Sequence, residues 1–192
     1  MKNPFDGWRG RIAAKVMAGA NRDMEQAALD RLAPGPAARV LALGFGAGVG
    51  IRLLRARCPE GCVAGVDPSG VMLDEATRRN RADVAAGRVQ LVRTGADALP
   101  FPAASFDGAL AVNSVQLWQP FEPSFVEVAR VLRPGARLVT LTHDWAIAHH
   151  ADPDAWRARA HAALAAAGFV EPEEWHGSAR SGRTLGLAAR RS

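Results

Sequence analysis

The sequence predicts an α/β fold: a doubly wound, mostly parallel sheet of seven strands, with helices on both faces and an antiparallel last strand. Short apolar runs suited to buried strands alternate with stretches of helical periodicity. That alternation is typical of parallel strands joined by right-handed crossovers. The last two apolar runs are joined by too few residues for a crossover helix, so we expect them to pair antiparallel.

Each predicted strand is a short run rich in apolar residues, which suits a sheet that helices cover on both faces. The seven runs are 39–43, 62–66, 88–93, 106–112, 137–142, 169–175 and 183–190. The predicted helices between them are 48–57, 70–84, 122–132 and 152–167. In the last helix Asp152 is a candidate N-cap, Pro153 lies in the first turn, and Gly168 follows as a stop signal.

The residues before the sheet have helical character. Apolar residues recur at near-helical spacing on either side of Asn21, so we expect two short helices. We expect residues 1–36 to form a helical lid over a cofactor-binding domain of residues 37–192, because closure of such helices excludes water. Phe5 and Trp8 are candidates to reach the pocket. An ordinary packing helix is the alternative.

Composition and charge limit the class of protein. The chain has 192 residues, of which 48% are hydrophobic and 22% charged, which excludes a wholly disordered chain. Its net charge is +5, but no basic run is interleaved with aromatic residues, so a nucleic-acid partner is not expected. The absence of a signal sequence or a membrane-length apolar run predicts a cytoplasmic protein without membrane contact. Cys58 and Cys62 have no second pair of ligands nearby, so we expect two inert thiols and no metal.

A glycine-rich turn is the sharpest feature of the sequence. Gly44, Gly46, Gly48 and Gly50 follow the strand at 39–43 and open a helix. Glycines permit a tight turn and close approach of a ligand, and the free N–H groups of a helix start favour a carboxylate or phosphate. The spacing matches neither the G-x-G-x-x-G dinucleotide pattern nor a phosphate-binding loop. A simple strand-to-helix turn is the alternative.

An acidic residue follows the next predicted strand. Asp67 lies 19 residues after Gly48, and its carboxylate is expected to face the same crevice. Two carboxylate oxygens can accept both hydroxyl groups of a ribose. The alternative is that Asp67 caps the helix beginning near Gly70.

Three later segments add to the glycine turn at 39–50 and to Asp67. They are 95–101 (GADALPF), 105–107 (SFD) and 127–136 (EVARVLRPGA). Taken together, these segments resemble the class I, seven-stranded S-adenosylmethionine-dependent methyltransferases. The resemblance is close over residues 37–143 and loose over the remainder. It implies the fold of that family, S-adenosylmethionine as cofactor and methyl transfer as activity.

The resemblance implies a cofactor-binding role for ten residues. They are Gly44, Phe45, Gly46 and Gly48 for methionine and ribose, Asp67 for ribose, Pro68 and Met72 for the adenine ring, Asp97 and Ala98 for the adenine edge, and Asn113 near the methyl group. A turn residue is the alternative for Asp97, and a loop cap for Asn113. Ala42 stands where the family usually has an acidic residue that helps to hold the cofactor's amino group. Backbone carbonyls near Gly44 are the expected substitutes.

The cofactor carries an activated methyl group, so the protein needs mainly to position the reactants. A general base is required only where the acceptor must lose a proton. His143, after the fifth predicted strand, is the candidate base, and a strand-end histidine is the alternative. Trp118, Phe121 and Trp145 either wall an acceptor pocket or pack at the sheet edge. His149 and His150 are not expected to bind a metal.

We therefore expect a methyltransferase acting on a small molecule, present as a monomer or homodimer. RNA or protein is the alternative acceptor, with the basic stretch 180–191 as its footprint. A cofactor-binding protein without turnover is a further alternative. The glycine spacing disfavours a nicotinamide-dependent oxidoreductase.

Overall fold

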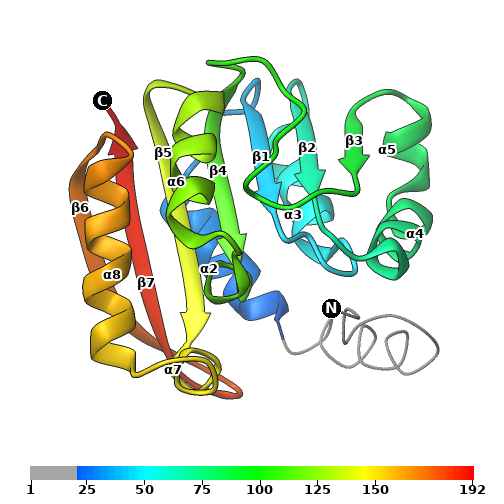
Figure 1. Cartoon of the computed structure of the whole chain (residues 1–192). Coiled ribbons are helices and arrows are strands. Elements are labelled where there is room, and N and C mark those ends of the chain that lie inside the picture. Colours follow the sequence, from blue (N-terminus) through cyan, green and yellow to red (C-terminus); the bar gives the residue numbers. More distant parts are fainter. Residues whose placement is uncertain (1–20) are drawn as a thin grey trace.

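A computed structural model describes residues 21–192, which form a seven-stranded sheet with helices on both faces (Figure 1). The strand order is β3-β2-β1-β4-β5-β7-β6. β7 is antiparallel to both of its neighbours, whereas the other pairs are parallel. The predicted fold class is therefore confirmed. The strands are β1 (Arg39–Leu43), β2 (Cys62–Val66), β3 (Val89–Val92), β4 (Phe106–Val112), β5 (Leu132–His143), β6 (Phe169–Ala179) and β7 (Gly182–Arg191).

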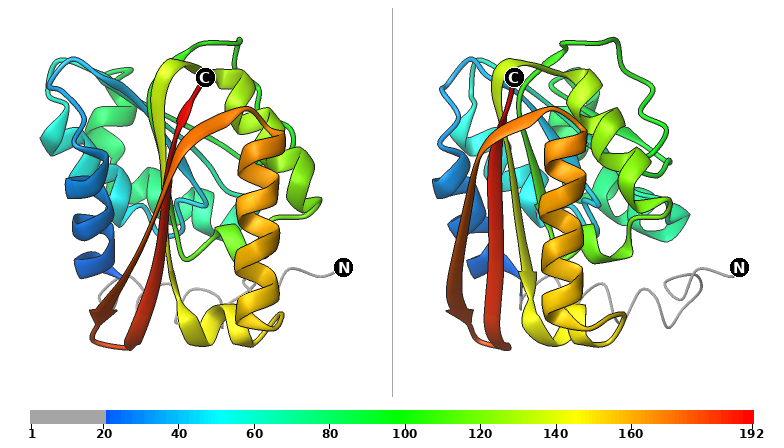
Figure 2. Two further views of the ribbon diagram at one scale, coloured as in Figure 1. Left: turned by 90° about the vertical axis from the view of Figure 1, so that its left-hand side faces the viewer. Right: turned by 60° about the vertical axis from the view of Figure 1, so that its left-hand side comes forward.

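The helices lie in two layers, one on each face of the sheet (Figure 2). They are α2 (Arg22–Leu32), α3 (Val49–Arg57), α4 (Gly70–Arg79), α5 (Arg81–Ala85), the 3₁₀ helix η1 (Val115–Leu117), α6 (Phe121–Val131), α7 (Asp144–Ala148) and α8 (Pro153–Ala166). α2, α3 and α4 contribute to one buried cluster, and α6 and α8 contribute to the other. β1 shows how the sheet serves both layers, because Leu41 and Leu43 enter one cluster while Val40 and Ala42 enter the other.

Three predicted elements differ clearly from those observed. The predicted helix 70–84 is broken at Asn80, whose Nδ2 donates to the carbonyls of Gly48 (3.1 Å) and Ala76 (2.9 Å). Such side-chain bonds to the backbone compete with helical ones. The predicted strand 169–175 continues to Ala179, because Gly177 pairs with Thr184 and the pairing with β7 persists to the turn. β5 likewise begins at Leu132 rather than at 137.

The helix α2 is packed directly on the sheet. Its apolar residues Met24, Ala28, Leu29 and Leu32 are buried, and it ends before Ala33, which has a positive φ of 47°. The other predicted N-terminal helix, with Phe5 and Trp8, lies outside the described residues. The lid of residues 1–36 therefore stays a prediction.

Within residues 21–192 no helix combines the length and the apolar character needed to cross a membrane.

Candidate cofactor-binding site

Four predicted site residues follow parallel strands at one edge of the sheet. Gly44 follows β1, Asp67 follows β2, Asn113 follows β4, and His143 ends β5. β1 lies between β2 and β4, so the strand order reverses here, and ligands bind at such switch points in doubly wound sheets. The edge is the one to which the arrows of β1, β2, β4 and β5 point in Figure 1.

The glycine turn leaves open space at its centre. Gly44, Gly46 and Gly48 have φ values of 73°, 50° and 77°, which side chains rarely adopt. A Cβ at Gly44 would collide with Ser114, and one at Gly48 would collide with Ala76 and Asn80. A Cβ at Gly46, in contrast, would have no atom within 4 Å. The turn therefore packs tightly against other residues at Gly44 and Gly48, and has open space at Gly46.

Asp67 bridges β2 and the glycine turn. Its Oδ2 accepts from the Gly46 N–H at 2.9 Å, and its Oδ1 accepts from the Ser69 N–H at 2.9 Å. Burial, with only 8% of the residue exposed, raises the pKa of this carboxyl, while the two backbone hydrogen bonds act in the opposite direction. Each oxygen keeps a lone pair for a further donor, so the carboxylate can still receive two hydroxyl groups.

Asn113 ties three elements together. It has a φ of 51°, unusual for a residue other than glycine. Its Nδ2 donates to Asn21 Oδ1 at 3.0 Å, at the start of α2, and its Oδ1 accepts from the His143 N–H at 3.1 Å. The amide predicted to contact the cofactor or acceptor is thus used to hold α2 and β5 against β4.

His143 is buried beside an exposed tryptophan. Only 2% of His143 is exposed, its ring stacks on Trp145 with centroids 5.4 Å apart, and Nδ1 finds no hydrogen-bond partner in the described part of the chain. Trp145 itself is 59% exposed. Trp118 and Phe121, however, pack against Phe125 in the core, so they are core residues rather than walls of an open pocket.

The residues predicted for the adenine lie on the other side of Asp67. Pro68 is exposed, and Met72 is buried in the first turn of α4, where its N–H meets Ser69 Oγ at 3.4 Å. Asp97 and Ala98 lie exposed in the loop after β3. The side chain of Phe45 packs in the core close to Gly65, so only its backbone is left to line the turn.

Sequence reasoning missed two residues that shape the turn. Ser114 Oγ donates to the Leu43 carbonyl at 2.7 Å and so joins the ends of β1 and β4. Asn80 holds the Gly48 carbonyl from the break between α4 and α5. Both contacts join residues more than 30 positions apart, and no local pattern indicates them.

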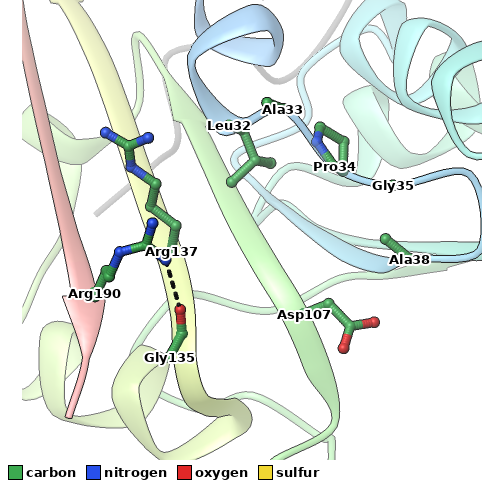
Figure 3. Close-up of a pocket in the computed structure, with 9 residues that line it drawn as sticks. All are labelled: Leu32, Ala33, Pro34, Gly35, Ala38, Asp107, Gly135, Arg137 and Arg190. Carbon is green, nitrogen blue, oxygen red and sulfur yellow. Dashed lines mark hydrogen bonds between the residues drawn. The ribbon is translucent and has the colours of Figure 1, made fainter.

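A separate hollow lies at the opposite edge of the sheet. The cavity of about 320 Å³ in Figure 3 is lined by the end of α2 and by Asp107, Arg137 and Arg190. It contains none of the predicted site residues. Its arginines are already paired, Arg137 with Glu173 and Arg190 with Glu171, so the hollow offers no free charge for an anion. Within residues 21–192 no group of three or more His, Cys, Asp or Glu side chains is placed to hold a metal ion.

Comparisons with known proteins agree with this geometry. Residues 40–135 match the family described as methyltransferase domain, so the chain belongs to the class I S-adenosylmethionine-dependent methyltransferases. It is 28% identical to an uncharacterized methyltransferase, YdaC of Bacillus subtilis, over 66% of this chain and 67% of that protein. It is 35% identical to a demethylmenaquinone methyltransferase of Thermus thermophilus, over 54% of this chain and 46% of that one. The chain thus spans between 46% and 67% of the length of these two relatives.

A solved methyltransferase structure shares the fold across nearly the whole chain. The S-adenosylmethionine-dependent methyltransferase of Aquifex aeolicus superposes with a TM-score of 0.76 at 17% identity, covering 94% of this chain and 97% of that chain. The observed residues suit the cofactor of such enzymes. A buried carboxylate faces a turn that is open at Gly46, and the N–H groups at the start of α3 lie beside it.

Proposed function

We propose that this chain transfers the methyl group of S-adenosylmethionine to a small-molecule acceptor. The observation that carries the proposal is the hydrogen bond between Asp67 and Gly46 at the point where the strand order reverses. It holds the carboxylate that we expect to bind the ribose directly against a turn with open space. The cofactor, when bound, supplies the activated methyl group.

The protein then contributes position and shielding. Asp67 would hold the ribose, and the Gly44–Gly48 turn would follow the cofactor backbone. The N-terminal turn of α2, fixed to Asn113 through Asn21, would cover the methionine end and exclude water. In-line attack at close range needs no more than this alignment where the acceptor has no proton to lose.

His143 is our candidate for the proton acceptor. It lies at the same edge of the sheet as Asn113, and its buried Nδ1 has no partner within residues 21–192. A neutral imidazole nitrogen can accept a proton from a hydroxyl acceptor as the methyl group is transferred.

The contacts made by arginines of the basic C-terminal stretch support a small acceptor. Arg183 pairs with Asp144 at 3.5 Å, Arg190 pairs with Glu171 at 3.3 Å, and Arg191 donates to the Ala129 carbonyl at 3.1 Å. These arginines are engaged within the protein and present no row of free charges to RNA. The Thermus relative, named as a demethylmenaquinone methyltransferase, also acts on a small molecule.

One surface favours a larger anionic acceptor as a second candidate. A hollow of about 510 Å³ beside α3, α4 and α5 is lined by four arginines, with Asp83 as its one acidic lining residue. The arginines are Arg52, Arg78, Arg79 and Arg81; Arg78 and Arg79 share an ion pair with Glu75, which leaves Arg52 and Arg81 as the charges available to an anion. An RNA acceptor bound there would lose affinity steeply as salt is raised.

Calorimetry and a transfer assay test the function. Adenosylhomocysteine should bind and NAD should not. Labelled methyl groups from S-adenosylmethionine should appear in the small-molecule fraction of a cell extract and not in RNA or protein. Binding of NAD, or absence of adenosylhomocysteine binding by folded protein, would contradict the proposal. Salt-sensitive label in RNA would favour the second candidate.

A further inference from the structure

Gly50, the fourth glycine of the turn segment, is explained by a different contact from the other three glycines. Gly50 lies inside α3 and does not have a positive φ. A Cβ built there would lie 3.0 Å from Glu25 Oε1 and closer still to Oε2. Gly50 therefore leaves room for the carboxylate of Glu25, which reaches across from α2 to the first turn of α3.

Glu25 stands at the methionine end of the predicted site. The start of α2 lies over the end of β4, because Asn113 contacts both Asn21 (3.0 Å) and the sulfur of Met24 (3.5 Å). On its other side Glu25 meets the helix start that follows the glycine turn.

The carboxyl group of Glu25 is desolvated, and residues 21–192 bring no cation to it. The residue as a whole is half-buried, but its carboxyl group is buried, and burial raises its pKa from 4.5 to about 8. No charged side chain among residues 21–192 contributes to that shift. The ion pair between the same two helices, Arg57 with Asp30 at 2.7 Å, lies at the far end of α2.

β1 supplies no charge beneath this position. Ala42 is buried in the same cluster as Met24 and Ile51 and brings only a methyl group to the layer between β1 and the helices. The backbone carbonyls near Gly44, which the sequence suggests as substitutes, are neutral acceptors and bind a cation more weakly than a carboxylate does.

We propose that Glu25 binds the ammonium group of the amino-acid part of S-adenosylmethionine. This assignment rests on the proposed function and names the group that holds one end of its cofactor. The ammonium is the part of the cofactor that combines positive charge with N–H donors, and a buried carboxylate needs such a partner. On binding, Glu25 gives its proton to solvent and forms a charged hydrogen bond.

Two ligands separate this role from a structural one. Adenosylhomocysteine carries the amino-acid group, whereas methylthioadenosine lacks it. Glu25→Gln should weaken adenosylhomocysteine binding by roughly 10- to 100-fold, the usual range for one charged hydrogen bond, and leave methylthioadenosine binding unchanged. Asp23→Asn changes an exposed carboxylate on the same helix and should alter neither affinity.

Gly50→Ala is an independent route to the same result. The added methyl group displaces the Glu25 carboxylate while alanine remains favourable in a helix. Adenosylhomocysteine should bind more weakly and methylthioadenosine as before. Calorimetry at pH 7 in two buffers of different ionisation enthalpy should also show proton release on adenosylhomocysteine binding, and Glu25→Gln should abolish it.

The outcomes are distinct. Equal weakening of both ligands in Glu25→Gln would show that Glu25 merely supports the turn, and unchanged affinity for both would show that it plays no part; either overturns the assignment. Failure of both ligands to bind the unaltered protein would instead overturn the proposed function.

Discussion

Asp67 combines two tasks in one carboxylate, because it already bonds to the backbone of Gly46 and Ser69 and still has lone pairs free for a ligand. We predict that Asp67→Ala lowers adenosylhomocysteine affinity by at least about 100-fold, since two hydrogen bonds to a charged group are lost. Titration calorimetry measures this. The variant should still show a cooperative thermal transition, and retained affinity in folded protein would mean that the ribose lies elsewhere.

Gly44 and Gly46 should respond differently to a side chain. Both have positive φ, which costs about 1–2 kcal/mol for other residues, but only at Gly44 does the new Cβ meet protein, at Ser114. Gly44→Ala should therefore lower the melting temperature more than Gly46→Ala does. Gly46→Val should fill the open space and block adenosylhomocysteine. Equal destabilisation by the two alanine variants would contradict this account.

Sequence patterns predict site residues only where the signal is local. The glycine turn and Asp67 each follow a strand directly, so chain order alone places them at one edge. Ser114 and Glu25 become meaningful only when β4 meets β1 and α2 meets α3. Their side chains belong to common types at ordinary positions, and nothing nearby in the sequence distinguishes them.

At the scale of helices and strands, hydrophobic periodicity predicts that an element exists more reliably than it predicts where the element begins and ends. β1, β2 and β4 match their predicted ranges because buried parallel strands are short and apolar. β6 extends beyond its prediction because hydrogen bonds to β7 continue through polar residues. The helix break at Asn80 depends on a hydrogen bond to Gly48, 32 residues away. Hydrophobic periodicity within the helix cannot indicate such a contact.

The sequence predicts Asp152 as the N-cap of α8, and the structure confirms it. Asp152 accepts from the Ala155 N–H at 2.9 Å, with Pro153 at the first helical position. Asp152→Ala should cost about 1 kcal/mol, which corresponds to a fall of about 2–4 °C in melting temperature for a chain of this size. Because α8 packs on β6 and α6, away from the glycine turn, adenosylhomocysteine affinity should not change. Differential scanning calorimetry with and without ligand checks both parts.

Across the whole molecule, the carboxyl groups of the candidate site and those of the surface have pKa values shifted in opposite directions. Glu127 beside Arg130, and Glu174 beside His161, have lowered pKa values, so they stabilise the fold above their ordinary pKa and lose that effect in acid. Glu25 and Asp67 have raised pKa values caused by burial, so their ionisation opposes folding. The candidate site is thus built from groups that cost stability, as expected where a ligand supplies the missing partner.

This arrangement predicts how stability depends on pH. Between about pH 4.5 and 8 the folded state holds a proton on Glu25 that the unfolded state has released, so the free energy of unfolding falls as pH rises through that window. Glu25→Gln removes this loss, and its melting temperature should fall less than that of the unaltered protein between pH 5 and 9. Thermal melts followed by circular dichroism measure both curves.

The Asp23→Asn control should parallel the unaltered protein. Saturating adenosylhomocysteine should reduce the difference in pH dependence between Glu25→Gln and the unaltered protein, because the bound ammonium stabilises the ionised carboxylate. Coincident curves for Glu25→Gln and the unaltered protein would show that the Glu25 carboxyl is not desolvated.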